Sequence, residues 1–266
     1  MSAEKRKKGV DILNPQIGPP PLDEVTRFEP VRYPVPREKY AELLQSYLDL
    51  ALDMGVEDAK IVHGKDIPQD IRALYLCNFP RCRWMNTNLL CPDHRKIPWE
   101  EALEIVDSFE YAIVYKVLPP SDKVVAEADI GPVKLGTHYI MSGGEAPDEA
   151  ILKREVIRLR ILGEMSRRLQ QAAYYHGYLL AMPISAGPCI ATWCSDSGKC
   201  VGTDPGGFCK YPVITSPVGQ AAFYIDFNGL GRMLGWGEMQ PGGNCTFMMD
   251  VPDFKGYYNI GINFII

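Results

Sequence analysis

Apolar residues recur every three or four positions in two long segments of the chain, a spacing that predicts amphipathic helices. The first segment runs from Arg37 to Met54 and is followed by Gly55, a residue type that commonly ends a helix. The second runs from Asp148 to about His176. We interpret its basic side as a solvated helix face; the alternative is a docking surface for an acidic electron carrier. The basic residues are Lys153, Arg154, Arg158, Arg160, Arg167 and Arg168.

Short apolar runs that lack this spacing predict strands. They cover residues 59–64, 111–117, 178–185, 245–251 and 257–266, the last two forming a hairpin. Pro98 and Pro217 stand before two further apolar segments, at the position where a helix tolerates proline. We therefore expect helices over 99–109 and 218–234.

The elements follow one order twice: helix, strand, cysteine-rich loop, proline-opened helix, strand. We expect an α/β fold of two duplicated units, related by a pseudo-twofold axis, around a mixed sheet. Both cysteine loops then lie at carboxyl ends of strands, the edge where open α/β sheets bind ligands. The expected divisions are an extended proline-rich arm (1–37), a first α/β half (38–117), a loop insert (118–147) and a second α/β half (148–266).

Seven prolines precede Arg37, and proline sustains neither a helix nor a sheet ladder. The segment therefore predicts an extended arm. Apolar residues between the prolines favour packing against another protein subunit or a second copy of the chain; the alternative is a disordered tail. These residues are Val10, Ile12, Leu13, Ile17, Phe28, Val31 and Tyr33.

The net charge of −5 lacks the basic excess that holds a nucleic-acid backbone, so we expect no nucleic-acid partner. No apolar run approaches the ~18 residues that a membrane span needs. No apolar signal region follows the charged first residues. We therefore expect a cytoplasmic protein, where cysteines serve as metal ligands or reactive thiols more often than as disulfides.

Seven of the eight cysteines fall in two loops, and only Cys245 lies outside them. The first loop holds Cys77, Cys82 and Cys91, and the second holds Cys189, Cys194, Cys200 and Cys209. Because the thiolate is a metal ligand, grouped thiols indicate a metal site. All seven are therefore candidate metal and cofactor ligands.

The cysteine spacing distinguishes between iron and zinc. The gaps are four and eight residues in the first loop and four, five and eight in the second, without any C-x-x-C pair. Zinc sites commonly use closer pairs, whereas iron–sulfur clusters accept wider spacing, and Cys91-Pro92 is similar to a bacterial ferredoxin motif. We expect two [4Fe–4S] clusters, with zinc as the alternative. His94 is a candidate ligand or proton donor, a surface role being the simpler interpretation.

These segments resemble the uncharacterised "predicted metal-binding protein" family of bacteria and archaea. The resemblance rests on Cys77, Cys82 and Cys91-Pro92 with the following helix and strand, then on Gly187-Pro188-Cys189, Cys194, Cys200, Cys209-Lys210-Tyr211-Pro212 and Ile225-Asp226. It covers about residues 40–117 and 150–265. The second cysteine group is usually tighter in the family, and Ile214-Thr215-Ser216-Pro217 replaces an Ala-Arg-Pro-Ser element. The resemblance implies iron–sulfur or other metal binding in anaerobic metabolism and no particular reaction.

Three functions fit these observations. The leading hypothesis is an iron–sulfur protein that transfers electrons as a subunit or partner of an anaerobic redox enzyme, with a ferredoxin-like carrier as one possible partner. The second is an enzyme in which a three-cysteine cluster leaves one iron open as a Lewis acid. The third is a zinc-stapled interaction module. No P-loop, GxGxxG, HExxH or GxSxG motif is present, so no catalytic residue is predicted.

Overall fold

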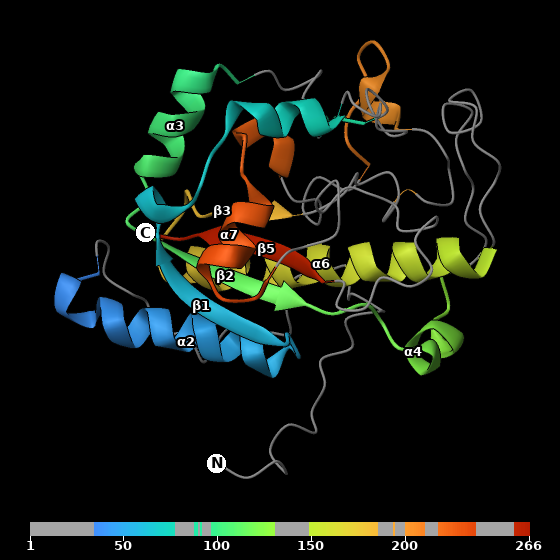
Figure 1. The fold of residues 1–266 in the computed structure, drawn as a ribbon, viewed down its shortest axis with the longest axis horizontal. Helices are drawn as coiled ribbons and strands as arrows, with labels where there is room; N and C mark the ends of the chain where they lie inside the picture. The colour runs from blue at the N-terminus through green and yellow to red at the C-terminus, as the bar shows by residue number, and fades with distance from the viewer. Residues whose placement is uncertain are drawn as a thin grey trace, which may run out of the picture.

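The computed structural model of the chain describes residues 35–77, 88–89, 91, 97–130, 149–185, 194, 200–210, 218–237 and 258–266. Within these residues five strands form one mixed sheet in the order β1-β2-β5-β3-β4 (Figure 1). They are β1 (Asp58–His63), β2 (Tyr111–Val117), β3 (Met182–Ser185), β4 (Val218–Gly219) and β5 (Asn259–Phe264). All neighbours are antiparallel except β3 and β4, which are parallel.

Helices cover both faces of this sheet. The α-helices are α2 (Tyr40–Asp53), α3 (Trp99–Asp107), α4 (Asp122–Glu127), α6 (Glu149–Tyr175) and α7 (Phe227–Met233). The 3-10 helices are η2 (Arg37–Lys39), η3 (Gly64–Asp66), η4 (Ile71–Cys77), η6 (Val201–Thr203) and η7 (Gln220–Phe223). The mixed α/β class and the first three predicted helices are confirmed. Gly55 ends α2 with a φ of +93°, a conformation that glycine adopts at low cost.

Strand β2 separates two apolar cores because both of its faces are buried. Ile113 and Tyr115 belong to the core that α2 and α6 cover, whereas Ala112 and Val114 belong to the core that α3 and α7 cover. This alternation follows from the two-residue period of a strand. In Figure 1, α7 lies in front of the sheet and α6 crosses behind it, so the fold has three layers.

The central pair of strands, β2 and β5, joins the two halves that the sequence predicts. In the first half β1 lies outside β2, and in the second half β3 lies outside β5. Both halves therefore contribute to one sheet. The duplication itself and the domain divisions stay predictions.

The two cysteine loops leave the sheet at opposite ends. Val62 pairs with Ala112, Ala112 with Phe264, and Phe264 with Met182, so the end of β1 is level with the start of β3. Strands β1 and β3 are therefore antiparallel, and their carboxyl ends point in opposite directions. Along the chain each cysteine loop follows a strand, β1 or β3, but the carboxyl ends of these two strands lie at opposite edges of the sheet, because a shared carboxyl edge requires parallel strands.

Three predicted elements differ from the structure. The insert over 118–147 contains a helix, α4, whose first turn is capped by the Ser121 hydroxyl accepting from Val124 N at 3.4 Å. The strand over 178–185 begins only at Met182, because Gly177 at φ +90° ends α6 and a turn follows. The helix over 218–234 is divided into β4, η7 and α7.

The division of that third segment has a local cause. Tyr224 has a φ of +55°, which a right-handed helix does not accommodate, and its hydroxyl donates to the Ile97 carbonyl at 2.8 Å. Asp226 then starts α7 by accepting from Gly229 N at 2.9 Å. Helix α7 ends before Gly235 at φ +75°, close to the predicted end.

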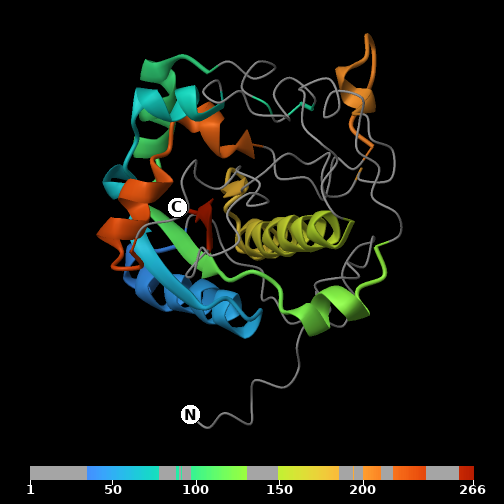
Figure 2. The ribbon, with the colours of Figure 1, turned by 45° about the vertical axis from the view of Figure 1, so that its right-hand side comes forward.

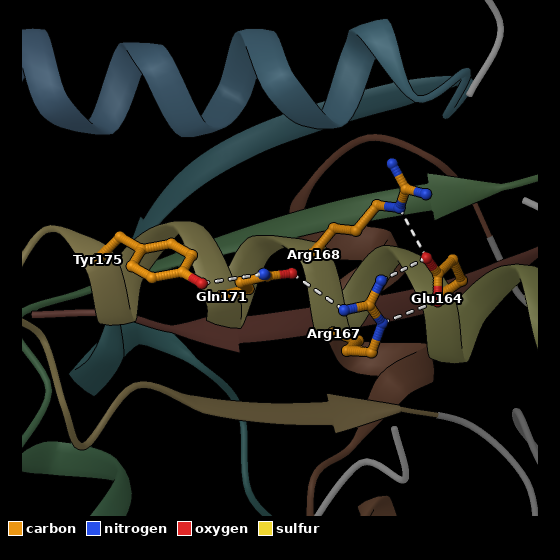
Figure 3. A network of polar contacts seen from close by, with 5 residues as sticks. All are labelled: Glu164, Arg167, Arg168, Gln171 and Tyr175. Carbon is orange, nitrogen blue, oxygen red and sulfur yellow. Dashed lines mark hydrogen bonds and ion pairs between the residues drawn. The ribbon is translucent and has the colours of Figure 1, made fainter. Parts of the chain in front are cut away.

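The middle of the basic side of α6 is not a solvated face. Arg158 is only 2% exposed and donates to the Asn259 side chain. Glu164 is fully buried and accepts from Arg167 and Arg168, each at 2.7 Å (Figure 3). Burial of Arg158 and Glu164 depends on such partners, because an unpaired buried charge is strongly destabilising. The solvated interpretation is therefore wrong for the middle of this helix.

The proline-rich arm up to residue 34, the strand over 245–251 and its hairpin turn lie outside the described residues. Strand β5 confirms the last predicted strand, and all six of its residues are buried. No helix in the described part of the chain is long and apolar enough to cross a membrane.

Candidate metal centre

The entry to the first cysteine loop is held against the exit from the second. The Gln69 amide donates to the Phe223 carbonyl at 3.0 Å and to the Ala102 carbonyl at 3.2 Å. Two backbone bonds continue the contact, from Asp226 N to Pro68 O at 2.9 Å and from Asp70 N to Tyr224 O. Helix η4, which ends at Cys77, thereby starts from a fixed position beside η7.

Asp70 starts η4 as a capping residue. Its carboxylate accepts from Arg72 N at 2.8 Å and pairs with the Arg72 guanidinium. The hydrogen bonds from Arg72 lower the pKa of Asp70 to about 2, so the cap stays charged at any physiological pH. The pair therefore supports the first turn of η4, the helix that leads to Cys77.

Cys91, the last cysteine of the first loop, is almost completely buried at 9% exposure. Its backbone N–H donates to the Asn88 carbonyl at 3.0 Å, which closes a turn. The Asn88 side-chain amide donates to Cys91 Sγ at 3.1 Å, and Asn88 itself has no exposed surface. The buried Asn88 side chain thus fixes the position of the Cys91 sulfur.

In the second loop, Cys194 and Cys200 are buried within the same apolar core as α2 and α6. The Cys200 carbonyl accepts from Thr203 N at 3.2 Å and from the Thr203 hydroxyl at 2.7 Å, which fixes the tight turn of η6. Cys209 at the far end of this turn is partly exposed. Residues 200–210 stand at the margin of the molecule, away from β1 and α2 (Figure 2).

The two cysteine loops meet at Leu89 and Gly202. A Cβ added at Gly202 would lie 2.5 Å from Leu89 Cδ1 and 3.5 Å from Cys209 N, so the leucine side chain would have to move to make room for it. Leu89 also packs on the apolar core that contains Cys194 and Cys200. Cys91 follows Leu89 by two positions, and Cys200 precedes Gly202 by two. Loops that leave the sheet at opposite ends therefore converge.

The described thiols suit a thiophilic metal in kind, because they are reduced, mostly buried and drawn from two converging loops. Among the residues that the structure describes, no three Cys, His, Asp or Glu side chains are grouped closely enough to hold a metal ion. The remaining candidate ligands lie outside the described residues. They are the side chain of Cys77 and the whole of Cys82, Cys189, His94 and Cys245. The seven-cysteine ligand set therefore stays a prediction.

Sequence reasoning missed Asn88, Leu89 and Gly202, although all three lie within the predicted loops. A single asparagine in a loop is typical of a turn, and a glycine between cysteines indicates only flexibility. Their partners become visible only when the two loops are placed together. The one available signal was their position, within three residues of Cys91 or Cys200.

Comparison with known families agrees with this site. A family model described as "Predicted metal-binding protein (DUF2284)" matches residues 60–242. The chain belongs to this family. The match includes both loops and all seven of their cysteines, confirms the resemblance that the sequence suggests, and ends before Cys245. No curated protein and no solved structure matches the chain.

Proposed function

We propose that this chain is an iron–sulfur protein that transfers electrons, as a subunit or partner of an anaerobic redox enzyme. The observation that supports it best is the convergence of the two cysteine loops at Leu89 and Gly202. Buried thiolates with wide, irregular spacing suit iron–sulfur clusters better than a zinc knuckle. The seven loop cysteines are the proposed ligands of two [4Fe–4S] clusters, which exchange single electrons when bound.

An exposed apolar side chain beside the thiols supports a transfer role. Phe208 is 86% exposed and directly precedes the partly exposed Cys209. Val201, at the start of the same turn, is 43% exposed. Electron-transfer complexes use small, transient interfaces, for which a few apolar side chains suffice. We propose that a ferredoxin-like carrier or an enzyme subunit docks on this turn.

The proline-rich arm adds a second proposed contact. Its apolar residues suit binding to another subunit or to a second copy of the chain, and proline restricts the backbone of the free chain, which would lower the entropy lost on binding. Deleting residues 1–34 should then reduce the mass of the assembly in solution while metal content stays unchanged. An unchanged mass would leave the arm without a role in assembly.

Anaerobic purification with assays of iron, acid-labile sulfide and zinc tests the central proposal. Two clusters require about eight irons and eight sulfides per chain. Zinc without sulfide would refute both iron–sulfur hypotheses and leave the zinc-stapled module. A full iron and sulfide content with activity on a bound substrate would favour the open-iron enzyme.

The docking turn has its own test. In Phe208→Ser, reduction of the clusters by a reduced bacterial ferredoxin should be slower, whereas reduction by dithionite should be unchanged. Leu180→Ser is the matched control, because Leu180 is 84% exposed but lies in the turn before β3. Equal ferredoxin rates in the wild type and both variants would contradict docking at Phe208.

A further inference from the structure

The Asn88 side chain is directed at a cysteine sulfur from within the protein. Asn88 has no exposed surface, and its amide nitrogen lies 3.1 Å from Cys91 Sγ. The backbone bond from Cys91 N to the Asn88 carbonyl, at 3.0 Å, sets the distance between the two side chains. The amide can therefore reach the sulfur without disturbing the turn.

The chemistry of this pair depends on the charge of the sulfur. A neutral thiol is a weak hydrogen-bond acceptor. A metal-bound thiolate keeps negative charge and accepts a stronger, charge-assisted bond. Burying an amide costs free energy unless its N–H groups find acceptors, and Cys91 Sγ is one acceptor of the Asn88 amide.

We propose that Asn88 is a positioning residue of the metal centre, which orients the Cys91 thiolate and tunes the metal that it binds. Donation to a ligand sulfur withdraws electron density from it and stabilises the reduced, more negative form of a cluster. Asn88 therefore raises the reduction potential of the cluster that Cys91 holds. The identity of that metal rests on the function proposed above, whereas the bond to sulfur does not.

The test compares three variants of the anaerobically purified full chain. Asn88→Leu keeps the approximate size and removes the donor, and Asn88→Asp keeps the shape and replaces the donor with an acceptor. Thr203→Val is the matched control, since it removes a side-chain hydrogen bond to the carbonyl of Cys200 rather than to a sulfur. Iron, sulfide and the reduction potential from a redox titration are measured for each.

We expect the two Asn88 variants to shift the reduction potential of one cluster to more negative values, and Thr203→Val to leave it unchanged. Asn88→Asp provides the answer where Asn88→Leu does not fold. An Asn88 variant with full cluster content and the wild-type potential would overturn the proposal. So would an equal shift in Thr203→Val, because that shift would reflect the loop alone.

The inference remains testable if the protein holds zinc instead. Cobalt then replaces zinc, and the sulfur-to-cobalt charge-transfer band reports directly on the thiolate. Asn88→Leu should move this band and speed metal transfer to a chelator by about 10–100-fold, the usual effect of losing a bond to a metal ligand. An unchanged band and rate would overturn the role of Asn88, whereas zinc content alone would overturn only the iron–sulfur function.

Discussion

The Tyr47 hydroxyl and His176 Nδ1 lie 2.8 Å apart and join α2 to the residue that follows α6. Tyr47 is buried, and its ring lies 5.5 Å from the imidazole. Burial lowers the pKa of His176, because a charged imidazolium loses its hydration there. Burial therefore favours the neutral ring, whose Nδ1 shares a hydrogen bond with the tyrosine hydroxyl.

This pair predicts a loss of stability in mild acid. Since the pKa of folded His176 lies below its ordinary value of 6.5, the unfolded chain takes up a proton at this site before the folded chain does. Protonation of His176 therefore leaves the free energy of unfolding unchanged well above pH 6.5. It lowers the free energy of unfolding as the pH falls below about 6.5. Urea unfolding at pH 7.5 and 5.5 measures it.

Two variants isolate the effect. His176→Gln should lose less stability between pH 7.5 and 5.5 than the wild type does. His63→Gln is the control, because it removes an imidazole that is exposed in the folded chain. The same loss in all three proteins would place the titrating group elsewhere.

The carboxylate of Glu164 predicts a large effect on stability. It has no exposed surface, while Arg167 and Arg168, which donate to it, are only 16% and 27% exposed. Glu164→Gln removes the charge that compensates both guanidinium groups, so we expect the free energy of unfolding to fall by about 3 kcal/mol. Chemical denaturation measures the change.

The control for this substitution is an exposed ion pair. Lys123 and Glu127 lie 3.9 Å apart with side chains 81% and 66% exposed, and Glu127→Gln should change stability by less than about 0.5 kcal/mol. A small effect at Glu164 would show that the arginines find other partners or solvent.

The sequence predicts the regular elements better than the environment of their side chains. Strand β2 agrees with the prediction to the residue, because a short continuous apolar run is what a strand buried on both faces requires. The basic side of α6 misleads because exposed and buried ion pairs use the same residue types. Its compensating acid, Glu164, lies only three and four positions before the two arginines.

The sequence does not predict how the two cysteine loops run relative to each other. Periodicity describes one element at a time, whereas the contact of Leu89 with Gly202 depends on two loops that leave the sheet in opposite directions. The grouping of the cysteines indicates metal and predicts the family. It says nothing of which loop faces which.

The contact between Leu89 and Gly202 predicts a specific pair of phenotypes. Gly202→Ala would place a methyl group 2.5 Å from Leu89 Cδ1, so the leucine would have to leave its position between the loops, and metal content should fall. Leu89→Ala in the same chain removes the obstacle and should restore part of the metal. If Leu89→Ala does not restore metal to the Gly202→Ala chain, Gly202 is needed for its backbone conformation rather than for its contact with Leu89.

The last prediction concerns the eighth cysteine. The loop cysteines number three and four, so the first of the two proposed clusters would be one ligand short unless Cys245, His94, solvent or a ligand exchanged between the loops completes it. The family match ends at residue 242, which leaves Cys245 outside the shared cysteine pattern. We therefore expect Cys245→Ala to keep its iron, and Cys200→Ala, which removes a buried loop thiol, to lose about four irons. Loss of four irons from Cys245→Ala would instead show a cluster with four cysteine ligands, and the open-iron enzyme would lose its chemical basis.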